Sequence, residues 1–148
     1  MTDTSRLATK RRASLALFDT VKQIDTITAP AYLTPAQRTD FAMAQRFLQA
    51  YTGSLGTFNS YRRDVGLLLQ WTWHIADKVL VDVKRDDMEA FIRFCRKPPS
   101  AWIGIKKAPR FRVKDGTRQP NPEWRTFVVT VSKSAFKKGM SPDQDCVR

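Results

Sequence analysis

The chain has 148 residues, which makes one domain the default and leaves room for only a small second one. Hydrophobic residues make up 42% and aromatic residues 11%, enough for a modest core. The net charge of +12 favours a polyanionic partner, nucleic acid before an anionic membrane. No apolar run approaches membrane-spanning length and the N-terminus has no secretory hydrophobic core, so we expect a cytoplasmic protein without a membrane partner.

Residues 1–33 are expected to form a basic N-terminal arm, with a short helix over about residues 14–24. Four cations precede that helix: Arg6, Lys10, Arg11 and Arg12. The composition fits a functional arm and fits equally a frayed leader that packs weakly. Pro30 ends the segment.

A helix over about residues 36–52 has a well-defined start. Thr34 can cap it, Pro35 suits the first helical position, and Gln37 completes a capping box. Gly53 is expected to close it. The apolar stripe of this helix comprises Phe41, Ala44, Phe47, Leu48 and Tyr51.

Residues 57–78 are expected to form one long amphipathic helix around which the rest of the chain is organised. Gly56 provides a bend and Thr57 can cap the first turn. The preceding loop is very short, so this helix should pack antiparallel to the one before it. Its buried face is expected to hold Phe58, Tyr61, Val65, Leu68, Leu69, Thr72, Ile75, Ala76 and Val79. Its polar face carries Asn59, Arg63, Gln70 and His74, flanked by Arg62 and Trp73.

A third helix is expected from about Arg85 to Arg96, with acidic residues at its positive N-terminal end and prolines after it. Its core-facing positions are expected to be Met88, Phe91, Ile92 and Cys95.

Residues 97–118 hold seven cations against the single carboxylate of Asp115, a net charge of +6, with aromatic residues interleaved. Asp115-Gly116 signals a tight turn, so we expect an irregular loop or a short hairpin. Residues 124–131 have strand propensity or lead into a helix, and residues 137–148 are expected to form a poorly ordered tail.

Side chains that could carry catalysis or hold a metal are sparse. The one histidine, His74, lies inside a helix, where packing or surface roles are the common ones. Cys95 and Cys146 are far apart, no Cys/His cluster has zinc spacing, and no glycine-rich phosphate loop is present. We therefore expect no metal, no cofactor, no small-molecule substrate and no autonomous enzyme.

Three stretches follow one another in an informative order. Residues 54–64, SLGTFNSYRRD, place a Thr, a Tyr four residues on, and then an Arg. A leucine-rich run ends in Trp71 and Trp73, and residues 82–92, DVKRDDMEAFI, come next. Over about residues 41–136 these features resemble the N-terminal core-binding (SAM-like) domain of tyrosine recombinases, the phage-type integrases. The stretches PPSAWIG and NPEWRTF look like an insertion found in a subset of mobile-element integrases.

The resemblance implies a small helical bundle that grips one side of duplex DNA, with catalysis supplied by a separate C-terminal domain carrying an Arg-rich set and a tyrosine nucleophile. No catalytic residue can be carried over, because Tyr32, Tyr51 and Tyr61 occupy predicted core or loop positions and His74 lacks the family's His-x-x-Arg element. The chain therefore resembles an integrase truncated before its catalytic domain. The helical domain would span residues 34–136, with a basic insertion at 97–130.

The expected function is DNA binding as the non-catalytic part of a site-specific recombinase acting in DNA integration and recombination. Double-stranded DNA is the expected partner, and an intact recombinase is a further candidate. Residues expected to hold DNA are Thr57, Asn59, Arg62, Arg63 and Gln70 on the central helix, and Lys106, Lys107, Arg110, Arg112, Lys114 and Arg118 in the basic loop. The alternatives are solvated surface cations, a basic RNA-binding or ribosome-associated protein, and a module that docks on an intact recombinase.

Overall fold

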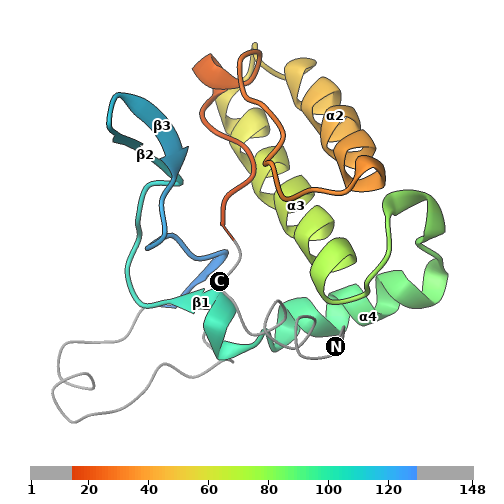
Figure 1. The fold of residues 1–148 in the computed structure, drawn as a ribbon. Helices are drawn as coiled ribbons and strands as arrows, with labels where there is room; N and C mark the ends of the chain where they lie inside the picture. The colour runs from red at the N-terminus through yellow and green to blue at the C-terminus, as the bar shows by residue number, and fades with distance from the viewer. Residues whose placement is uncertain (1–14, 130–148) are drawn as a thin grey trace, which may run out of the picture. The chain divides into compact units, whose positions relative to one another are not determined.

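The computed structural model describes residues 15–129 of the chain (Figure 1). Contacts divide it into two compact units. The N-terminal unit is Ala16–Asp87, and the C-terminal unit here means the described residues from Met88 onward. The division falls inside the range 34–136 that was expected to form one domain. The cations at positions 6–12 and the predicted tail at 137–148 lie outside the described residues.

The described chain is helix-rich but also contains short strands, so it is more than a bundle of helices. The helical elements are η1 (Val21–Gln23), α2 (Pro35–Gln49), α3 (Leu55–His74), η2 (Leu80–Asp82), α4 (Arg85–Arg96) and η3 (Ser100–Trp102). The strands are β1 (Ile103–Gly104), β2 (Phe111–Lys114), β3 (Thr117–Pro120) and β4 (Phe127–Val128).

The start of α2 confirms the predicted capping box. The Thr34 hydroxyl accepts a hydrogen bond from the Gln37 amide at 3.2 Å, and the Gln37 side-chain oxygen accepts one from the Thr34 amide at 2.9 Å. Pro35 occupies the first turn, where a missing N–H costs nothing. The helix ends at Gln49, before the predicted position 52.

The central helix α3 is shorter than predicted at its C-terminal end. It begins at Leu55, so Thr57 lies inside the first turn and is not the cap, and its hydroxyl accepts a hydrogen bond from the Ser54 hydroxyl at 3.0 Å. It ends at His74, shortly before Asp77, which adopts a left-handed φ of 58° that a helix cannot continue through.

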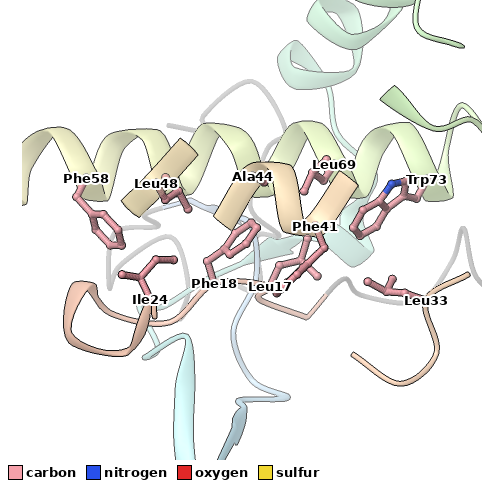
Figure 2. Packing of buried hydrophobic residues seen from close by; sticks show 10 residues of the cluster. All are labelled: Leu17, Phe18, Ile24, Leu33, Phe41, Ala44, Leu48, Phe58, Leu69 and Trp73. Carbon is pink, nitrogen blue, oxygen red and sulfur yellow. The ribbon is translucent and has the colours of Figure 1, made fainter. Parts of the chain in front are cut away.

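The core of the N-terminal unit lies between α2, α3 and the irregular segment that precedes them (Figure 2). Its side chains come from all three: Leu17, Phe18, Ile24 and Leu33 from the segment, Phe41, Ala44 and Leu48 from α2, and Phe58, Leu69 and Trp73 from α3. The Phe18 and Phe41 rings stack with centroids 5.0 Å apart. Residues 16–33 therefore complete the core, and of the two alternatives for this segment, the weakly packed leader does not hold for them. The expected helix over 14–24 is reduced, in the described part, to the single turn η1.

Several predicted core positions are confirmed and others are wrong. Phe41, Leu48 and Leu69 are buried, and Val65 packs against them. Tyr61 is 37% exposed and joins Phe47 and Tyr51 in a surface aromatic cluster. Its position at the edge of the apolar stripe, next to two other rings, explains why sequence periodicity assigned it to the interior.

A buried carboxylate ties α2 to α3 and to the connector after it. Asp40 Oδ2 accepts hydrogen bonds from the Trp73 indole N–H and from the Leu80 amide, both at 3.0 Å. Trp73, predicted to flank the polar face, is thereby held in the core.

The C-terminal unit has a small aromatic core of its own. Trp102 is buried and meets the Phe94 ring edge-on at 5.1 Å, and Phe94 lies 6.3 Å from Phe127. The parallel pair β1–β4 places Phe127 beside Ile103. Phe94 was not among the predicted core positions of α4. The expected core position Ile92 is 51% exposed, and no residue of α4 is fully buried.

Candidate nucleic-acid interface

The basic region 97–118 contains β2 and the first half of β3, which together form an antiparallel hairpin (Figure 1). Asp115 and Gly116 form its two-residue loop with φ of 53° and 77°, the left-handed pair that a type I′ turn requires. Gly116 accepts that conformation without strain, and Asp tolerates it better than most residues. The tight turn predicted from Asp115-Gly116 is confirmed, and the alternative of a wholly irregular loop is not.

The register of the hairpin distributes its side chains between two faces. Arg112 pairs with Gln119 and Lys114 with Thr117, so these four side chains share one face. The opposite face carries Val113 with its partner Arg118, and Phe111 with Pro120 nearer the base.

The base of the hairpin is fixed by Asn121. Its side-chain amide donates to the Pro109 carbonyl at 2.9 Å, and its backbone amide donates to the Arg110 carbonyl at 2.9 Å. Its side-chain oxygen accepts from the Glu123 amide at 3.1 Å. Asn121 is buried and directly follows β3, and it bonds to the two residues that precede β2. It therefore joins the two strands at the base of the hairpin.

Arg110 is engaged at the same base. Its guanidinium lies 4.9 Å from the centroid of the Trp124 ring, a cation–π contact, and the side chain is exposed only in part. We therefore assign Arg110 a packing role in place of its expected role as a DNA contact. No local sequence pattern signals that role.

The remaining predicted cations of this region are exposed. Lys106 and Lys107 lie on the connection from β1 to β2, and Arg112 and Lys114 lie on β2. None of these four forms an ion pair with any residue in the range 15–129. Because each is exposed and has no described ion-pair partner, each is available to an anionic partner. Arg118 is also exposed, on the other face of the hairpin.

The predicted residues of α3 are in the other unit and differ among themselves. Asn59 and Arg63 are exposed, and the Arg63 guanidinium contacts the neighbouring Asp64 carboxylate at 3.3 Å with both side chains 63% exposed. Thr57 is half-buried. Gln70 is 3% exposed, so its expected place on an open polar face is wrong.

Arg62 is turned toward the N-terminal segment. Its guanidinium donates to the Asp19 backbone carbonyl at 3.1 Å and lies 5.9 Å from the Phe58 ring centroid. Burial lowers the pKa of Arg62, and the nearby Asp19 carboxylate opposes that shift. A guanidinium committed to the segment at residues 16–33 is not available to hold a phosphate, so Arg62 is removed from the candidate interface.

Two polar residues of the hairpin were not predicted as candidates. Gln119 and Thr117 join the set only because the strand register places them beside Arg112 and Lys114. A signal for them was present in the sequence. With a two-residue loop at 115–116, each residue of one strand pairs with the residue of the other strand that lies the same number of positions from the turn.

In residues 15–129 we find no helix with the length and apolar character needed to cross a bilayer. The same residues contain no group of three or more His, Cys, Asp or Glu side chains placed to hold a metal ion.

Comparison of the chain with protein-family models, with curated proteins and with solved structures found no match.

Proposed function

We propose that this chain binds duplex DNA through phosphate contacts made by the cations of the β2–β3 hairpin and of the connection that leads into it. The observation that carries the proposal is the state of Lys106, Lys107, Arg112 and Lys114: all four are exposed, and none is paired with a described carboxylate. Clustered unpaired cations release counterions from a polyanion when they bind it, which supplies essentially all of the affinity in non-specific protein–DNA binding.

The exposed Arg63 and Asn59 of α3 form a second, smaller group in this proposal. They lie in the first half of the helix, where a guanidinium and an amide can hold phosphate oxygens. The ion pair with Asp64 weakens the attraction of Arg63 for an external anion, because the guanidinium must first separate from the Asp64 carboxylate. We therefore assign the larger share of the affinity to the hairpin cations.

The order of the three sequence stretches supports a finer proposal, that the chain is the non-catalytic, core-binding part of a tyrosine recombinase. The first two stretches lie on α3 and most of the third lies on α4, and α2 precedes them through a short loop, as a small core-binding bundle would require. Under this proposal the chain holds DNA but neither cleaves nor rejoins it. A covalent protein–DNA adduct formed by the purified chain would overturn this part.

The proposal is tested by fluorescence anisotropy of a labelled, random-sequence DNA duplex titrated with the purified chain at fixed salt. The variant Lys106→Ala/Lys107→Ala should bind several-fold more weakly. The matched control Lys22→Ala/Arg46→Ala removes the same charge from exposed positions of the N-terminal unit and should bind like wild type. Equal losses in the two variants would reduce the proposal to an effect of net charge. Unlabelled RNA that competes better than unlabelled DNA would assign the surface to RNA.

A further inference from the structure

The hairpin is uncovered on both faces within the part of the chain that the structure describes. Every residue from Arg112 to Gln119 is exposed, including Val113, whose exposed fraction is 64%. A sheet that belongs to a core has at least one face packed against another layer, and no described layer packs on this one. The hairpin is therefore a free ribbon two strands wide, held by Asn121 at its base and by the Asp115-Gly116 turn at its tip.

One face of this ribbon carries side chains suited to base edges. Arg112 and Gln119 are cross-strand partners, and Lys114 with Thr117 is the next pair on that face toward the turn. An arginine can donate two hydrogen bonds to a guanine in the major groove, and a glutamine can both donate to and accept from an adenine. The opposite face carries the apolar Val113, paired with Arg118, between these two pairs along the ribbon.

We propose that the β2–β3 hairpin enters the major groove of duplex DNA as a two-stranded ribbon, with Arg112 and Gln119 reading base edges. The major groove, about 12 Å wide, admits such a ribbon and distinguishes all four base pairs, whereas the minor groove, about 6 Å wide, presents a degenerate pattern that Arg112 and Gln119 could not read in the same way. Lys106 and Lys107 precede the ribbon and are placed to hold phosphates beside the groove. This inference rests on the proposed function, because a hairpin can read bases only if the chain binds duplex DNA.

The test begins by selecting preferred duplexes from a random library with the full chain. Its affinity for the selected duplex is then compared with that for a scrambled duplex, using wild type, Gln119→Ala and Arg112→Lys. Neither substitution changes the net charge, so phosphate attraction is retained. The matched control is Val113→Ala, a neutral change on the opposite face of the same ribbon. Circular dichroism and the proton shifts of the hairpin check that each variant keeps its fold.

We expect Gln119→Ala and Arg112→Lys each to reduce the ratio of selected to scrambled affinity by about 5- to 100-fold, as expected for removal of one good base contact. Val113→Ala should leave the ratio unchanged. Replacing the purines of the selected duplex with 7-deazapurines, which lack the N7 acceptor of the major groove, should reduce wild-type affinity to a similar extent.

Three outcomes would overturn the inference while leaving the proposed function standing. They are salt-dependent binding with no preferred sequence, a ratio that survives both substitutions, and insensitivity to 7-deazapurines. Absence of any duplex binding would instead overturn the proposed function itself, so the two failures are distinguishable.

Discussion

Asp40 is the residue on which the N-terminal unit depends most clearly. Replacing it with alanine leaves the Trp73 indole N–H and the Leu80 amide without their acceptor in a largely buried site. We expect a decrease of about 2–4 kcal/mol in the free energy of unfolding, since an unsatisfied buried donor costs about 1–3 kcal/mol. Asp40→Asn keeps one carbonyl oxygen in place and should be less destabilised. Urea unfolding of the three proteins measures this, and equal destabilisation of the two variants would contradict the assigned role.

Tyr61 and Phe58 together test which face of α3 is buried. Because the Tyr61 ring is partly exposed and its aromatic contacts are with the exposed Phe47 and the half-buried Tyr51, Tyr61→Ala should cost only about 1–2 kcal/mol. Phe58→Ala, at a fully buried position of the same helix, should cost about 3–5 kcal/mol. If thermal and urea unfolding ranked the two variants in the opposite order, the placement of these rings would be wrong.

Asp87 gives the N-terminal unit a defined pH dependence. Hydrogen bonds from the Lys78 ammonium at 2.8 Å and from the Lys84 amide at 2.9 Å lower the pKa of Asp87 from its ordinary value of 3.8. The folded state therefore holds the proton less tightly than the unfolded state does. The stability that Asp87 contributes is complete above pH 3.8 and disappears as the pH falls through the folded pKa.

Asp87→Asn removes this titration. Between about pH 5 and about pH 2 its unfolding midpoint should fall less steeply than that of wild type, while above about pH 5 wild type should be the more stable of the two. Parallel curves for the two proteins over that range would show that the Asp87 contacts contribute nothing.

At the scale of single residues, local contacts could be predicted from the sequence and distant ones could not. Thr34, Pro35 and Gln37 lie within four residues of each other, so their capping box follows from the sequence alone. The bonds of Asp40 reach 33 and 40 residues along the chain, and that of Arg62 reaches back 43, so no local pattern signals them.

The β2–β3 hairpin is the element that we propose contacts DNA. Gly116 has a φ of 77°, which a β-branched residue adopts only with strain. Gly116→Val should weaken the β2–β3 ladder and with it the duplex affinity, whereas Gly116→Asn should be tolerated, because asparagine enters the left-handed region readily. Proton shifts across the Arg112–Gln119 pair report the ladder, and anisotropy reports the affinity. A valine variant that keeps the ladder but no longer binds DNA would mean that the turn itself contacts DNA.

Element identity was more predictable than element ends. The helical periodicity of residues 36–52, 57–78 and 85–96 predicted α2, α3 and α4. However, α3 ends early, close to Asp77, which has a left-handed backbone conformation. An aspartate can adopt that conformation but does not require it, so the residue type alone does not predict the end of the helix. Likewise, Asp115-Gly116 predicted the turn, whereas the anchoring of the hairpin by Asn121 depends on tertiary contacts.

At the scale of the whole molecule, the segment at residues 16–33 is the largest departure from expectation. It has almost no regular structure, so it gives no periodic signal, yet Leu17, Phe18, Ile24 and Leu33 fill the space beside α2 and α3. This packing also changes the candidate interface, because the same segment takes up Arg62. The candidate residues that remain exposed are mostly in the C-terminal unit, and the N-terminal unit retains Arg63 and Asn59 as a separate group.

The central claim is that the exposed cations around the hairpin bind DNA phosphates, and the salt dependence of binding tests it most directly. Duplex affinity is measured over a range of salt concentrations for wild type, Lys106→Ala/Lys107→Ala, and the control Lys22→Ala/Arg46→Ala. The slope of log affinity against log salt should become shallower by about 0.9 for each phosphate that is no longer neutralised, so by up to about 2 in the Lys106/Lys107 variant. The control should keep the wild-type slope. Identical slopes in all three proteins would contradict the claim and return these lysines to the role of solvated surface charges.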